Sequence, residues 1–216
     1  MNISADDPQG SPAKKQGNQL DAAGGMTPEQ IWSGIYQKVE GHCGTLSTIK
    51  AAIIRFWQDP QGIFRRVQVA RDGFEVIMRD SFTLQVTHDE MRQAYEASTF
   101  YGSHTQLLNY ANFLYAVSAK RAQMESNDAG AGERFAAALR TLDESEHPGE
   151  ALRRLGLIGC MRESTVDELM KAALGTQAHN EHAGAVTDGA TESAGQKHDV
   201  ASSRWMNAGF RASKLV

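Results

Sequence analysis

The sequence is poor in cysteine and has no excess of basic residues. Among 216 residues there are only Cys43 and Cys160, which lie far apart. Two cysteines cannot form the disulfide framework of a small secreted protein, so we expect free thiols in a reducing compartment. Lysine and arginine number 22 against 26 acidic residues, and the net charge is −4. This balance lacks the basic stripe of a dedicated nucleic-acid-binding protein, so we expect no nucleic-acid partner.

Long hydrophobic runs are also missing. Apolar runs are short, such as residues 51–54, and fall far below the roughly 20 residues that span a bilayer, so we predict no membrane span. Residues 1–26 contain almost nothing large and apolar and no hydrophobic stretch of a secretory signal. Such a segment cannot offset the entropy of ordering, and we predict that it is disordered. Residues 27–216 suffice for one globular domain.

Helical periodicity accounts for most of the predicted order. Thr27 and Pro28 suit the start of a helix whose apolar residues recur to Val39. Thr87 with Glu90 forms a capping box, a second start signal. The expected helices span residues 28–39, 43–57, 88–98, 105–124, 133–143 and 149–155, and a further helix starts after Thr165 and ends near residue 174.

Turn signals between apolar segments predict strands. Arg71–Asp72–Gly73 separates expected strands 64–70 and 74–79, and Asp188–Gly189 joins 183–187 to 190–194. Two more strands are expected at 82–86 and 201–206. The predicted fold class is α+β, helix-rich with a small antiparallel sheet.

One group of residues has the composition of a thiol enzyme. Cys43 stands at a predicted helix start, and a helix N-terminus lowers the pKa of a thiol toward the nucleophilic thiolate. Acyl transfer also needs an imidazole base, a group that orients it and donors for the oxyanion. Gln37 lies six residues before Cys43, His182 opens an apolar strand, and Asn207 follows it. The alternative is that Cys43 is a small buried apolar residue.

The ordered set of Gln37, Cys43, His182 and Asn207 resembles the papain-like cysteine protease superfamily. The resemblance implies a papain-like fold without a cofactor. It also implies that Gln37 and the Cys43 N–H form the oxyanion hole. His182 would be the general base and acid, and Asn207 would orient it. The substrate would be a protein amide, and deamidation or transglutamination would use the same residues.

Further segments are similar to the calpain-like branch, namely residues 62–80 after the cysteine helix and Phe100–Tyr101–Gly102–Ser103. The sequence departs from the family at Gly44, where a tryptophan is usual. It also lacks the tryptophan that usually follows the asparagine and shields its hydrogen bond to histidine. These departures leave open an alternative function, a catalytically inactive papain-like fold that acts as an interaction protein.

The sequence offers other candidates for the same site. Asp199 is the alternative orienting residue for His182. His179 and His182 could form a metal pair, but no further ligand stands at suitable spacing, so we expect no metal site. Cys160 lies among apolar residues and is expected in the core.

The polar start and the absence of a secretory signal resemble bacterial type III effectors with a papain-like core. By that analogy the protein is made in the cytoplasm and is secreted into a host cell, with a secretion chaperone as partner.

Overall fold

The computed structural model describes residues 26–37, 43–56, 62–125, 134–142, 148–171, 174–179, 182–193, 195–199 and 211–216. The predicted disordered segment, except Met26, and the predicted strand 201–206 lie outside these ranges. The described residues form an α+β fold with small antiparallel sheets, as the sequence predicted. Its helices and strands are α1 Pro28–Gly34, β1 Tyr36–Gln37, α2 Cys43–Phe56, β2 Phe64–Ala70, β3 Gly73–Met78, β4 Thr83–Thr87, α3 His88–Ala97, β5 Phe100–Tyr101, α4 Thr105–Glu125, α5 Phe135–Thr141, α6 Pro148–Arg154, a 3₁₀ turn Ile158–Cys160, β6 Met161–Ser164, α7 Val166–Met170, β7 Gly175–His179, β8 His182–Thr187, β9 Ala190–Ser193, β10 Gln196–Asp199 and β11 Arg211–Leu215.

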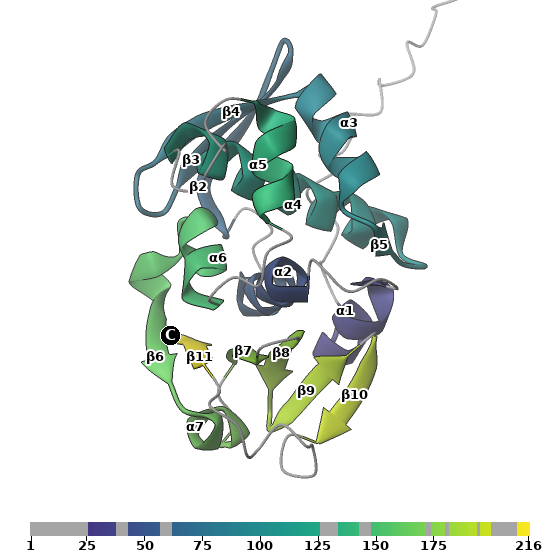
Figure 1. Cartoon of the computed structure of the whole chain (residues 1–216), viewed down its shortest axis with the longest axis vertical. Coiled ribbons are helices and arrows are strands. Elements are labelled where there is room, and N and C mark those ends of the chain that lie inside the picture. Colours follow the sequence, from purple (N-terminus) through teal and green to yellow (C-terminus); the bar gives the residue numbers. More distant parts are fainter. Residues whose placement is uncertain are drawn as a thin grey trace, which may run out of the picture.

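Helix α2 lies at the centre of the molecule and is seen nearly end-on in Figure 1. The three-stranded sheet β2–β3–β4 and helices α3 to α5 lie on one side of it, and a six-stranded sheet lies on the other. Helix α2 contacts β7 and β8 of the large sheet as well as α4 and α6. Its buried apolar residues, Leu46, Ile49 and Ile53, belong to the main core. The helix therefore joins the two halves.

The helix starts follow the predicted caps, but the first helix is shorter than expected. The Thr27 and Thr87 hydroxyls accept backbone hydrogen bonds in complete capping boxes. The predicted helix 28–39 was wrong at residues 35–37, because Ile35 is extended and the next two residues form β1. Residues 38 and 39 lie outside the described residues. A Cβ on Gly102 would stand 1.9 Å from the Gly34 carbonyl oxygen. The close approach of the β5 end therefore requires glycine at position 102.

The large sheet has the strand order β10–β9–β8–β7–β11–β6, and every pair is antiparallel. The predicted hairpin at Asp188–Gly189 is confirmed, and both residues have the positive φ values, 50° and 72°, that a tight two-residue turn requires. Strand β11 lies between β7 and β6, although it follows both by many residues.

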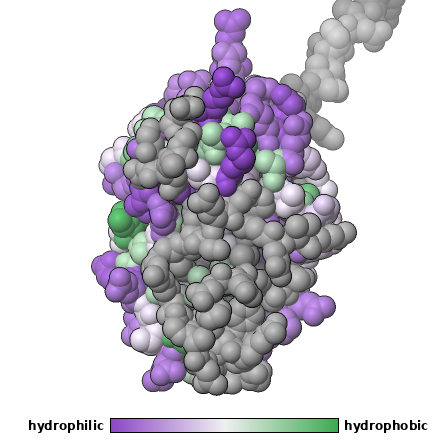
Figure 2. Space-filling model, viewed as in Figure 1, coloured by the Kyte–Doolittle hydropathy of each residue, from purple (hydrophilic) through white to green (hydrophobic). Residues whose placement is uncertain are grey.

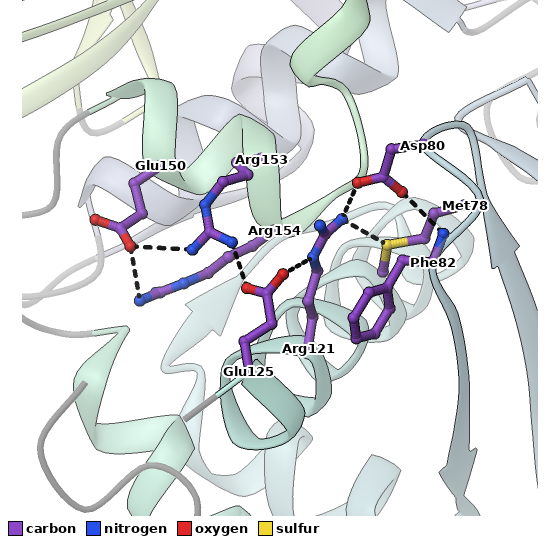
Figure 3. A network of polar contacts seen from close by, with 8 residues as sticks. All are labelled: Met78, Asp80, Phe82, Arg121, Glu125, Glu150, Arg153 and Arg154. Carbon is purple, nitrogen blue, oxygen red and sulfur yellow. Dashed lines mark hydrogen bonds and ion pairs between the residues drawn. The ribbon is translucent and has the colours of Figure 1, made fainter. Parts of the chain in front are cut away.

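A cluster of buried and half-buried charges ties α4, α6 and the β3–β4 turn together (Figure 3). The Arg121 guanidinium lies 2.6 Å from an Asp80 carboxylate oxygen and 2.9 Å from one of Glu125. Arg153 also pairs with Glu125, and it contacts Glu150 at 3.2 Å. Arg121 also stacks on the Phe82 ring at 4.6 Å. Arg154 lies 3.8 Å from Glu150 as the third arginine of the cluster. Arg121 and Arg153 each meet two carboxylates, which compensates in part for the desolvation of their charges.

Hydrophilic side chains cover most of the described surface on the face in Figure 2, and the hydrophobic areas between them are small. Among the described helices, none has the length and apolar character needed to cross a membrane.

Candidate functional site

Gln37 stands in extended backbone just after α1. Strand β1 pairs with β5, with Tyr36 opposite Tyr101 and Gln37 opposite Phe100. The two tyrosine rings stack at 6.2 Å. The Gln37 amide nitrogen Nε2 is buried and meets no hydrogen-bond acceptor within the described ranges. A buried donor without a partner is costly, and a catalytic role is one of the explanations for such a donor.

Cys43 is the first residue of α2, so its backbone stands at the positive end of a 14-residue helix dipole. Residues 38–42, which connect it to β1, lie outside the described residues. Six peptide steps separate Gln37 from Cys43, which limits their Cα separation to about 20 Å.

His182 is the first residue of β8 and pairs with His179, the last residue of β7. Helix α2 packs against this strand. Because β9 runs antiparallel to β8, the turn that leaves β9 lies at the end of the sheet where β8 begins. This turn contains Gly195, where a Cβ would lie 3.4 Å from the Cβ of Tyr36. The start of β8 therefore lies on the side of the sheet that meets β1.

Of the two candidates for the orienting residue, Asn207 lies outside the described residues, and Asp199 is the last residue of β10. Asp199 pairs with Ala190, which in turn pairs with Thr187 at the far end of β8. Five residues of strand separate Thr187 from His182, about 16 Å. The sheet therefore does not bring Asp199 to His182.

The metal site and the second cysteine were also considered in the sequence predictions. Within the described part of the chain, no three histidine, cysteine or acidic side chains are grouped as metal ligands. Cys160 is half-buried in the 3₁₀ turn, so its predicted place in the core was wrong. The neighbouring Ile158 is 51% exposed, so this segment lies at the surface of the protein.

Two features were missed in the sequence at the corner where α1, α2 and the β9–β10 turn meet. They are the buried Lys50 in α2 and the close turn at Gly195. The lysine interrupts an otherwise uncharged apolar face, which is the signal that could have revealed it. Glu29 of α1 pairs with Lys197 of β10 at 3.2 Å, which also ties the large sheet to this corner. A hydrogen bond from its own backbone N–H, and then Lys197, hold the pKa of Glu29 below its ordinary value.

No protein-family model, curated protein or solved structure matches the chain. Its likeness to papain-like proteases rests on the pattern of residues at positions 37, 43, 182 and 207.

Proposed function

We propose that this protein is a papain-like thiol hydrolase that cleaves amide bonds of protein substrates. The observation that carries the proposal is the corner formed by three elements. Gln37 offers a buried amide donor that meets no acceptor among the described residues. Cys43 begins the central helix six residues later, and that helix packs on the strand that His182 begins. An oxyanion donor, a nucleophile at a helix N-terminus and a base on a neighbouring strand are the parts that acyl transfer requires.

The reaction would proceed in two halves. His182 takes the proton of the Cys43 thiol, and the thiolate forms a bond to the substrate carbonyl carbon. The Gln37 amide and the Cys43 N–H donate to the oxyanion. As the oxyanion collapses, the carbon–nitrogen bond breaks, and the amine leaves with the proton held by His182. Water, deprotonated by His182, then hydrolyses the thioester, and Asn207 keeps the imidazole oriented throughout.

The reactivity of Cys43 tests the proposal directly, and the chain supplies its own control. The variant Cys160→Ser leaves Cys43 as the single thiol, whereas Cys43→Ser leaves Cys160. We expect iodoacetamide to alkylate Cys43 at pH 6 at least tenfold faster than free cysteine, because an activated thiol is ionised there. Cys160 should react no faster than free cysteine. Equal slow rates for both thiols would instead favour the inactive interaction protein.

Hydrolysis of a mixed peptide library, followed by mass spectrometry, tests the remaining roles. Gln37→Ala should lower kcat about 10²-fold, as loss of an oxyanion donor does. His182→Ala should lower it about 10²- to 10⁴-fold. The matched control is His179→Ala, which changes the residue that pairs with His182 on the neighbouring strand and should change kcat less than threefold. If His179→Ala and His182→Ala behave alike, His182 is not the base.

A further inference from the structure

Lys50 is a fully buried cation within the central helix. Its side chain is 0% exposed, and its ammonium group Nζ donates a hydrogen bond of 3.3 Å to the Trp32 carbonyl oxygen. Lysine is almost never fully buried unless it has partners, because its charge is expensive to desolvate. A lysine retained at such a position therefore needs a reason beyond packing.

The carbonyl that Lys50 binds belongs to the last turn of α1. The final carbonyl groups of a helix have no partner within the helix, and a cation nearby interacts favourably with the helix dipole. Helix α1 has no basic residue in its own last turn. Lys50 thus caps α1 from α2, immediately before the chain turns into the strand that carries Gln37.

A third element reaches the same carbonyl. A Cβ on Gly195 would lie 3.7 Å from the Trp32 oxygen, and Gly195 has a φ of 80°, which favours glycine. The turn between β9 and β10 therefore closes over the end of α1. This turn stands at the end of the sheet where β8, headed by His182, begins.

Lys50 also lies on the face of α2 that leads to Cys43. Seven residues separate them, which is two turns with an offset of about 20° around the axis and about 10.5 Å along it. Side chains on a helix lean toward its N-terminus, so the Lys50 side chain leans in the direction of Cys43.

We propose that Lys50 is a positioning residue for the hydrolase. It fixes the end of α1, and with it Gln37, against the helix that presents Cys43. The inference rests on the proposed function, and Lys50 itself takes no part in bond making or breaking.

The test compares two substitutions that remove a buried cation from the full-length protein. Lys50→Met removes the ammonium and keeps an unbranched apolar side chain, and Arg121→Met does the same in the charge cluster of Figure 3, which joins α4, α6 and the β3–β4 turn. Each variant is measured for kcat and KM on the same peptides, for the alkylation rate of Cys43, and for backbone hydrogen exchange of Ile35 to Gln37.

We expect Lys50→Met to lower kcat at least tenfold with less than a threefold change in KM, and to speed exchange of Ile35 to Gln37 at least tenfold. Arg121→Met should change kcat and this exchange less than threefold, although it destabilises the fold more. Lys50→Arg, which keeps the charge and donors, should retain kcat within threefold. If Lys50→Met leaves kcat and exchange at wild-type levels, or if Arg121→Met matches its effects, the proposal is overturned.

Two safeguards keep the test decisive. If Lys50→Met does not fold, Lys50→Gln is measured in its place with the same expectations, because its side chain is one bond too short to reach the carbonyl. If wild-type Cys43 reacts no faster than free cysteine, the hydrolase proposal fails by itself. The exchange of Ile35 to Gln37 then decides separately whether Lys50 holds this segment.

Discussion

Two buried cations, Arg121 and Lys50, have opposite surroundings. Arg121 meets the carboxylates of Asp80 and Glu125 within a cluster that joins α4, α6 and the β3–β4 turn. Lys50 donates to a backbone carbonyl at the end of a neighbouring helix. Removing one member of an ion cluster leaves buried charge unpaired, whereas loss of the hydrogen bond from Lys50 leaves the Trp32 carbonyl without this donor. The difference predicts that Arg121 stabilises the whole fold, whereas Lys50 fixes the position of the end of α1.

The largest expected effect on stability is that of Arg121→Met. The substitution leaves the Asp80 carboxylate without its cation, and we expect a loss of about 3–5 kcal/mol in the free energy of unfolding. Lys50→Met should cost less than about 2 kcal/mol. Urea denaturation measures both. The double variant Arg121→Met, Asp80→Asn should recover part of the loss, and no recovery would mean that the Arg121–Asp80 pair is not the source of the stability.

Gly102→Ala tests the same corner through β5, which pairs with the strand that carries Gln37. Its Cβ would clash with the Gly34 carbonyl, so α1 and β5 must move apart, at a cost of about 1–3 kcal/mol. Because β5 pairs with the strand that carries Gln37, we also expect kcat to fall. The matched control is Gly159→Ala, where a Cβ meets nothing within 4 Å and stability should change by less than about 0.5 kcal/mol. Equal effects at both glycines would contradict the tight approach.

The two capping boxes offer a smaller and cleaner contrast. Thr27→Ala and Thr87→Ala each remove a side-chain acceptor from a helix start and should each cost about 1 kcal/mol, measured by thermal denaturation. Only Thr27 caps the helix that leads to Gln37. We therefore expect Thr27→Ala to lower kcat and Thr87→Ala to leave it unchanged, and a reversed order would count against the corner as the reactive site.

The smallest expected effect concerns the exposed pair of Glu29 and Lys197. Because the pKa of Glu29 is lowered in the folded state, the stability that the group contributes is present above its unfolded pKa and is lost as the pH falls through its folded pKa. The pair is mostly exposed, so its contribution should be at most about 0.5 kcal/mol. Melting curves of Glu29→Gln and wild type should differ most at pH 7 and converge at low pH. A constant difference would exclude this charge effect.

The sequence predicted the parts of the fold that local signals specify. Strands 64–70 and 82–86 match β2 and β4 within a residue, because apolar alternation and a turn at Arg71–Asp72–Gly73 act over short distances. The helices at 88–98 and 105–124 also match α3 and α4. Their caps and periodicity lie within the segments themselves.

Of the large sheet, the sequence predicted only the hairpin of β8 and β9. Strands β6, β7, β10 and β11 are rich in small, polar and charged residues and lack clear alternation. Their pairing depends on partners far along the chain, which local patterns do not encode. For the candidate site, the sequence shows the order of Gln37, Cys43 and His182. It did not predict the extended backbone at Gln37, because the helical spacing of apolar residues continues through Ile35 to Val39.

The position of β11 has a consequence for synthesis. Arg211–Leu215 lies between two strands that are made earlier, so β6 and the outer edge of β7 stay unpaired while translation continues. Cys43 and His182 leave the ribosome before the sheet beside them can close. A nascent chain would thus expose the unpaired edges of β6 and β7 until residues 211–215 have left the ribosome.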